Sequence, residues 1–169
     1  MSECCKNFKY VVKHHIDEAK RHSHNFRFID DVLCWDEEPP SSEIYGLEWS
    51  ETTNSNGSVN FLGGKIQNID GRISTWLFDK AAEWQFSFLR YPHCDSNVPC
   101  HQPASVFQGQ LCRFRMICNS IRAFKHAVSQ LVLRMLSRGH RPAALVKGWN
   151  RHLQKHSNDR ITNYSRLRQ

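Results

Sequence analysis

Two adjacent carboxylates, Asp30 and Asp31, lie between two short apolar segments of the chain. Neighbouring negative charges repel each other, and a bound cation relieves the repulsion. Mg²⁺ or Mn²⁺ takes oxygen ligands, and a pair of such ions can hold the attacking and leaving oxygens of a phosphoryl transfer. The pair is therefore a candidate for both metal binding and catalysis. The competing interpretation is a polar turn with two hydrated aspartates.

A second candidate is a thiol and imidazole cluster in a proline-rich segment, formed by His93, Cys94, Cys100 and His101. Two cysteines and two histidines form a suitable zinc set, but the spacing between the two cysteines exceeds the usual two to four residues. It is also difficult for a His and a Cys that are adjacent in the sequence to bind the same ion with both side chains. We therefore favour free loop thiols over zinc, and a stoichiometric zinc assay decides between them.

Basic residues are the third candidate, because they gather in one part of the chain. Residues 1–80 hold 9 Lys/Arg and 13 Asp/Glu, a balance of −4, whereas residues 81–169 hold 14 and 3, a balance of +11. Such a half suggests a polyanionic partner such as nucleic acid, and a solvated basic surface is an equal alternative on charge alone. The phosphate-binding candidates on predicted helices are Arg113, Arg115, Arg122, Lys125, Arg134, Arg138 and Lys147.

The expected elements place the carboxylates in a small sheet. Apolar spacing predicts an amphipathic helix over residues 6–21. Two apolar segments around the Asp pair predict a hairpin over 26–35 with the carboxylates at its turn. Alternation predicts strands over 44–51, 59–66 (interrupted at Gly63-Gly64) and 73–78, with turns at 54–57 and 68–71. Residues 26–79 are thus expected to form a small antiparallel sheet.

The rest of the chain is expected to be helical. Apolar residues recur every three or four positions from Phe107 to Met135, and Asn119-Ser120 divides them into two helices. Gly139 suits a helix end, and Pro142 suits the start of a further helix to about His156. Cys112 and Cys118 fall on the apolar stripe and are expected in the core. We assign a packing role, rather than base stacking, to Trp49, Trp76, Trp84 and Trp149.

The amino-acid composition indicates the cellular compartment in which the protein acts. The seven cysteines are an odd number, which excludes a complete disulfide framework, and the N-terminus lacks the pattern of a secretory signal. No apolar run approaches the roughly 18 residues of a membrane span. We therefore expect an intracellular protein, nuclear or cytoplasmic, that is neither secreted nor bound to a membrane.

Several segments resemble reverse transcriptases of the Penelope-like and related retroelement type. Residues 27–33, Arg-Phe-Ile-Asp-Asp-Val-Leu, resemble the aromatic-x-Asp-Asp box of these enzymes. Residues 60–66, Asn-Phe-Leu-Gly-Gly-Lys-Ile, resemble the turn known as the primer grip, and residues 77–80 resemble the segment that closes the palm. Shorter segments at 91–93, 97–99, 110–113, 115–118 and 137–140 follow in the same order, so that the resemblance covers roughly residues 24–155.

The resemblance implies roles for single residues. Asp30 and Asp31 would be the catalytic and metal-binding pair, with Phe28 near the primer terminus. Phe61, Leu62 and Gly63 would contact the primer backbone. The helices from Pro103 to Gly139 would form a thumb whose basic face holds the RNA or DNA template–primer duplex.

The chain also departs from this family. The third catalytic carboxylate does not appear in residues 1–25, where Asp17 and Glu18 lie on a helical pattern, and the nucleotide-selecting element is missing. We therefore expect that the chain alone does not polymerise DNA, and that a separate N-terminal half or a second copy pairs with it. Template-dependent dNTP incorporation by the purified chain, abolished by Asp30→Ala, would contradict this expectation.

The sequence thus predicts an α+β fold with a small antiparallel palm-like sheet and a basic helical thumb-like bundle. Its expected parts are a partial palm in 1–80, an irregular proline-rich connector in 81–103, the helical part in 104–156 and a flexible basic tail in 157–169. The favoured function is a fragment of an RNA-directed DNA polymerase. The alternative is a non-catalytic nucleic-acid-binding or interaction protein derived from such an element.

Overall fold

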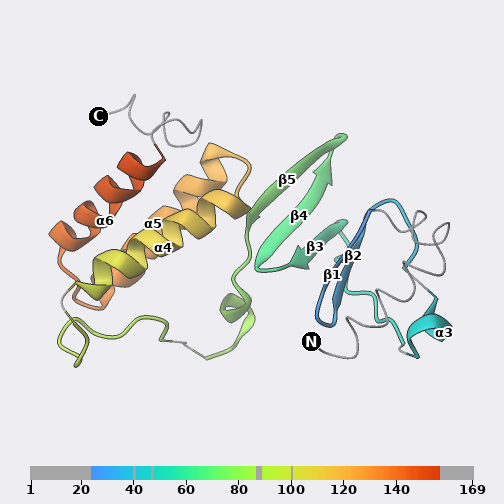
Figure 1. Ribbon diagram of the computed structural model, residues 1–169, viewed down its shortest axis with the longest axis horizontal. Coiled ribbons are helices and arrows are strands. Elements are labelled where there is room, and N and C mark those ends of the chain that lie inside the picture. Colours follow the sequence, from blue (N-terminus) through green and yellow to red (C-terminus); the bar gives the residue numbers. More distant parts are fainter. Residues whose placement is uncertain (1–23, 40, 47, 87–88, 100, 157–169) are drawn as a thin grey trace. The chain divides into compact units, whose positions relative to one another are not determined.

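The structure, a computed structural model, describes residues 24–39, 41–46, 48–86, 89–99 and 101–156 (Figure 1). The chain forms two compact units, Met1–Thr52 and Thr53–Gln169, and each is described here by itself. The helix expected over 6–21 and the tail over 157–169 lie outside the described residues. No helix in the described ranges has both the length and the apolar character that crossing a bilayer requires.

A two-stranded hairpin is the main element of the first unit. Strand β1 (Asn25–Phe28) pairs antiparallel with β2 (Asp31–Cys34), with Phe28 opposite Asp31. The expected hairpin is confirmed, although its turn is shifted by one residue. Ile29 and Asp30 form the turn, and Asp31 is already the first residue of β2.

The strand expected over residues 44–51 is wrong. A short helix, α3 (Ser42–Tyr45), begins there instead, because the Ser41 side chain accepts a hydrogen bond from the Glu43 N–H at 3.3 Å. Gly46 ends the helix with a φ of 60°, a left-handed conformation that glycine adopts without steric cost. The residues described from 48 to 51 form no strand.

The second unit begins with a three-stranded antiparallel sheet in the order β3-β4-β5. Its strands are β3 (Ser58–Phe61), β4 (Gly64–Ile69) and β5 (Arg72–Leu77). The single strand expected over 59–66 is wrong, because the chain reverses at Leu62-Gly63. Both residues have positive φ, 51° and 75°, which is the requirement of a tight hairpin turn. Asp70 and Gly71 make the second such turn.

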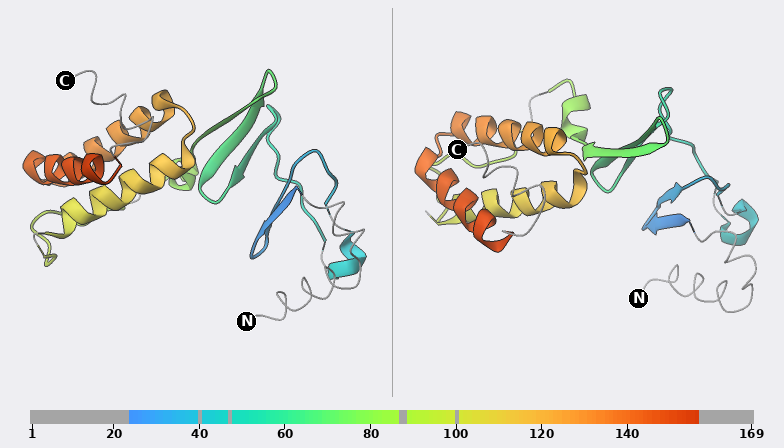
Figure 2. Two further views of the ribbon diagram at one scale, coloured as in Figure 1. Left: turned by 45° about the horizontal axis from the view of Figure 1, so that its top comes forward. Right: turned by 90° about the horizontal axis from the view of Figure 1, so that it is seen from above.

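Three helices complete the second unit, as the apolar spacing predicted (Figure 2). They are α4 (Gln102–Ile117), α5 (Ile121–Ser137) and α6 (Pro142–Lys155), preceded by the short 3₁₀ helix η1 (Lys80–Glu83). Ser120 separates α4 from α5 by accepting a hydrogen bond from the Ala123 N–H at 3.2 Å. Gly139 follows α5 with a φ of 75°. The α+β class expected from the sequence is therefore confirmed.

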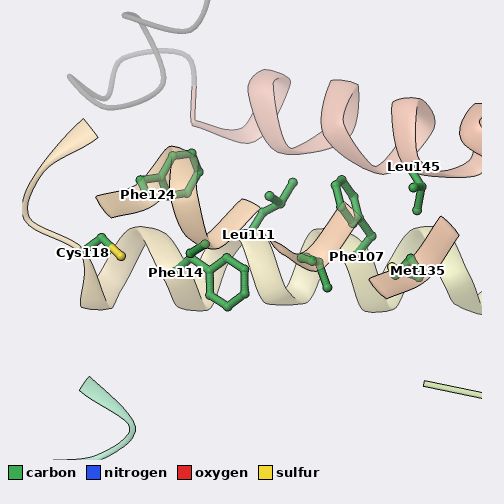
Figure 3. Close-up of a cluster of buried hydrophobic side chains, with 9 residues drawn as sticks. Phe107, Leu111, Phe114, Cys118, Phe124, Met135 and Leu145 are labelled. Atoms are coloured by element: carbon green, nitrogen blue, oxygen red, sulfur yellow. The ribbon is translucent and has the colours of Figure 1, made fainter. Parts of the chain in front are cut away.

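One apolar core lies among the three helices (Figure 3). Leu111, which is 0% exposed, lies near the middle of α4 and belongs to the same cluster as Phe124 on α5 and Leu145 on α6. Cys118 is buried in this cluster, as expected. The remaining members are Phe107, Phe114, Ala127, Leu131 and Met135. Burial of these side chains is the main force that holds the helices together.

Asn119, between α4 and α5, fastens the sheet to the helices. Its side-chain carbonyl accepts from the Thr75 N–H at 3.0 Å, and its amide donates to the Ile73 carbonyl at 2.6 Å. The Thr75 hydroxyl donates to the Ile117 carbonyl at 2.6 Å. Strand β5 and the helices therefore belong to one unit. The expected division into residues 1–80, 81–103 and 104–156 stays a prediction. The compact units of the structure divide at 52/53.

Helix α6 lies close to α4 at Gly148, which supports a stability prediction. A Cβ at Gly148 would lie 2.8 Å from the Ala104 carbonyl oxygen and 3.0 Å from the Phe107 ring. Gly148→Ala is therefore expected to destabilise the second unit by about 1–3 kcal/mol through overpacking. Gly109, exposed on α4 with nothing near its Cβ position, is the matched control. Gly109→Ala is expected to stabilise by about 0.5–1 kcal/mol.

Urea unfolding, followed by helical circular dichroism, measures both variants. Equal effects of the two substitutions would contradict the close approach of α6 to α4.

Candidate nucleic-acid interface

Asp30 and Asp31 lie at the exposed end of the β1–β2 hairpin. Both side chains can therefore reach a hydrated ion. The described part of the chain contains two groups of three metal-ligating atoms, and neither includes this pair. The third carboxylate that the sequence analysis did not find is thus not supplied by these groups.

The turn before the carboxylates has an unusual backbone. Ile29 has a φ of 56°, which a β-branched side chain rarely adopts. Such strain costs about 1–3 kcal/mol and often occurs at functional sites. The Arg27 side chain braces the turn by donating from Nε to the Ile29 carbonyl at 2.9 Å. The hairpin thus holds Asp30 and Asp31 in a fixed position at its exposed end.

In the second unit, the turn between β3 and β4 lies against a basic residue of α4. The Arg113 guanidinium lies beside Gly63, and the φ of 75° at Gly63 is what favours glycine at this position. Leu62, beside it, is 52% exposed. Phe61 is half-buried in β3. The structure thus brings the predicted primer-grip-like turn and one predicted phosphate ligand together, although 50 residues separate Gly63 from Arg113.

A cleft of about 450 Å³ lies between η1 and the C-terminal end of α5. Arg134 and Arg90 both contact the Asp79 carboxylate in this cleft, Arg134 at 2.7 Å. Arg138 donates from Nε to the Tyr91 carbonyl at 3.1 Å. Three arginines and one aspartate therefore line the cleft, and its charge is positive.

Arg113 belongs to the same positive region. Burial raises the pKa of the Tyr91 phenol, although the nearby charges of Arg90, Arg134 and Arg113 act in the opposite direction. The charge of Arg113 thus acts on the same phenol as the charges of Arg90 and Arg134. We call Arg90, Arg113, Arg134 and Arg138 the arginine cluster.

Asp79 organises this cluster through its charge. Burial by itself raises the pKa of Asp79, but the hydrogen bond and charge of Arg134, the charge of Arg90 and the Ala81 N–H together hold it below its ordinary value of 3.8. A lowered folded-state pKa contributes stability above the unfolded-state pKa, and this contribution is lost as the pH falls through the folded-state value.

Asp79→Asn is therefore expected to destabilise the second unit at neutral pH and to make no difference in strong acid. Urea unfolding of wild type and variant, from neutral pH down to about pH 2, measures the difference. It is expected to shrink on acidification, beginning near the ordinary aspartate pKa. A difference that stays constant with pH would show that the Asp79 carboxylate is not stabilised by these arginines.

The cleft also carries two exposed aromatic rings. Trp84 and Phe86 stack with their centroids 5.3 Å apart, and they are 42% and 64% exposed. The packing role that the sequence suggested for Trp84 stays a prediction; its ring packs on Phe86, and both residues line the cleft. Stacked rings beside arginines are typical of surfaces that bind nucleic-acid bases.

The remaining predicted phosphate ligands are distributed over the three helices. Arg122 and Lys125 are exposed on α5, and Lys147 is exposed on α6. Arg115 is half-buried on α4. The cleft-lining residues include none of these four. Arg90, which does belong to it, was not a candidate, because the irregular segment 81–103 has no period from which to infer a shared face.

The thiol and imidazole cluster expected from the sequence lies only partly within the described residues. Cys100 lies outside the described residues, so the four-residue set is not tested. His93 and Cys94 are exposed and lie with Asp95, which accepts a hydrogen bond from the Cys94 thiol at 3.3 Å. This hydrogen bond is the main cause that raises the pKa of Cys94.

Comparisons with protein-family models, with curated proteins and with solved structures found no match to the chain.

Proposed function

We propose that the chain is part of an RNA-directed DNA polymerase of the retroelement type, whose second unit holds the template–primer duplex. The observation that carries the proposal is the contact of the Leu62-Gly63 turn with Arg113, the residue that joins this turn to the arginine cluster. Leu62 gives the turn an exposed apolar surface that can contact a sugar–phosphate backbone. The cluster supplies the charge.

The arginine cluster has the chemistry that phosphate recognition requires. Two of its four guanidinium groups, those of Arg90 and Arg134, contact the Asp79 carboxylate, and the four positive charges exceed this one negative charge by three. An arginine can donate two parallel hydrogen bonds to one phosphate. Phosphate contacts of this kind hold a duplex in register without reading its sequence.

The hairpin of the first unit supplies the second part of the proposal. Asp30 and Asp31 bind Mg²⁺ or Mn²⁺ and act on the primer end once a third carboxylate is supplied by a separate N-terminal half or a second copy. Alone, the chain binds duplex but does not extend it. It acts inside the cell, in the nucleus or the cytoplasm.

A non-catalytic nucleic-acid-binding protein is the second candidate, favoured by the lack of a third ligand group around Asp30 and Asp31 among the described residues. Both candidates need the arginine cluster. They differ in whether the two carboxylates bind a functional metal ion.

Photo-crosslinking tests the placement of the duplex on the full chain. Leu62, 52% exposed in the β3–β4 turn, is replaced by p-benzoylphenylalanine and irradiated with a labelled template–primer. Ile73, 50% exposed near the other end of the sheet, is the matched control position. We expect the Leu62 position to crosslink the primer strand and the Ile73 position to give little product. Equal crosslinking at both positions would contradict the proposal.

A further inference from the structure

Three potential metal ligands from two helices converge outside the arginine cluster. Cys112 comes from α4, and His152 and His156 come from the C-terminal end of α6. The Cys112 Sγ lies 3.6 Å from His152 Nδ1 and 3.5 Å from His156 Nε2. All three ligand atoms lie within 4.8 Å of one another. We propose that these three side chains bind one Zn²⁺ ion, which clips α6 to α4.

The distances suit zinc. A tetrahedral ion with the usual zinc–sulfur and zinc–nitrogen bonds holds sulfur and nitrogen about 3.5 Å apart. Both sulfur–nitrogen distances here are close to that value. The donor in each sulfur–nitrogen contact depends on the imidazole tautomer, and one divalent ion can take all three atoms as ligands. The set of one thiolate and two imidazoles is also of the type that zinc prefers.

Neighbouring aromatic rings hold the proposed ligand side chains in position. His152 is 1% exposed and stacks between Phe124, at 6.3 Å, and Trp149, at 6.2 Å between ring centroids. His156 lies four residues later, on the same helix face, with its ring centroid 4.8 Å from that of His152. The last turn of a helix also carries the negative end of the helix dipole, which favours a cation.

The site is partly exposed, which leaves room for a fourth ligand besides the three side chains. Cys112 and His156 are half-buried, so solvent reaches part of the site. Three protein ligands leave a fourth position for water. On binding, the Cys112 thiol gives its proton to solvent, and the sulfur coordinates as a thiolate. The ion thus adds a link between α4 and α6 beside their apolar contacts.

Metal binding by the full chain tests the proposal. The protein, purified in metal-free buffer with its thiols reduced, is titrated with zinc alone, and Co²⁺ serves as the spectroscopic probe. We expect about one zinc per chain and a tetrahedral cobalt spectrum with a thiolate charge-transfer band. Cys112→Ser and His156→Gln are each expected to weaken zinc binding more than about 100-fold, since loss of an outer-shell partner alone costs roughly 10- to 100-fold.

Matched variants separate this site from other zinc-binding positions. Cys94→Ser changes the exposed thiol of the His93 cluster, and His126→Gln changes an exposed histidine of α5. Both are expected to retain zinc and the cobalt spectrum. A chelator is expected to lower the thermal midpoint of the wild type and leave that of Cys112→Ser unchanged. Absence of stoichiometric zinc in the wild type, or its loss in Cys94→Ser but not in Cys112→Ser, would overturn the proposal.

Discussion

Replacing Arg113 with glutamine is expected to weaken binding of the chain to a template–primer duplex about eightfold at 0.1 M monovalent salt. Arg113 joins the Leu62-Gly63 turn to the arginine cluster, so its loss removes one phosphate contact. Each such contact adds about 0.9 to the logarithm of the affinity for each tenfold dilution of salt, so relative to about 1 M salt one contact contributes about eightfold at 0.1 M. Fluorescence anisotropy with a labelled duplex measures the affinity.

The matched control is Arg72→Gln, which removes the same charge. Arg72 is exposed at the β4–β5 turn, at the other end of β5 from Leu77. Its replacement is expected to leave the affinity within about twofold, because distant exposed charges are screened. An equal loss in both variants would mean that net charge, and not the arginine cluster, binds the duplex.

Leu111→Ala is expected to lower the free energy of unfolding of the second unit by about 2–5 kcal/mol. Leu111 is completely buried in the core shared by α4, α5 and α6, and its truncation leaves a cavity. The helices position the arginine cluster, so duplex binding is expected to fail at the temperature at which this variant unfolds. Urea unfolding and duplex binding over a temperature series measure the two effects.

Met116, on the same helix, provides the control for this substitution. It is 82% exposed, so Met116→Ala is expected to change stability by no more than about 0.5 kcal/mol. A similar loss in the two variants would contradict the position of the core along α4.

The helices were predicted well because their signals are local. The spacing of Phe107, Leu111 and Phe114 fixes the buried face of α4, and the Ser120 cap and Pro142 mark helix starts within one turn. Strand predictions failed where pairing decides the structure. Alternation over residues 44–51 is not sufficient without a partner strand, and the Ser41 cap favours a helix there.

The positive φ of Leu62 explains another difference. Leucine rarely adopts this conformation, so the sequence suggested an interrupted strand and not a hairpin. The partner of the turn, Arg113, is also 50 residues away, and no periodicity reveals contacts at such a separation.

The proposed zinc ligands were missed for the same reason. Cys112 was assigned to the core because it falls on the apolar stripe of its helix, but it is half-buried and faces two imidazoles. The spacing of His152 and His156, four residues apart on a predicted helix, was a usable signal. It did not identify Cys112, which lies 40 residues earlier than His152 and meets it only through the packing of α4 on α6.

The salt dependence of duplex affinity tests the central claim most directly, namely that the arginine cluster holds a nucleic-acid duplex. Wild-type affinity for a template–primer is measured over a range of monovalent salt concentrations. Four arginines in contact with phosphates predict a slope of about −3 to −4 in the logarithmic plot, and Arg113→Gln is expected to reduce its magnitude by about 1. A slope near zero, or an unchanged slope in Arg113→Gln, would contradict the account.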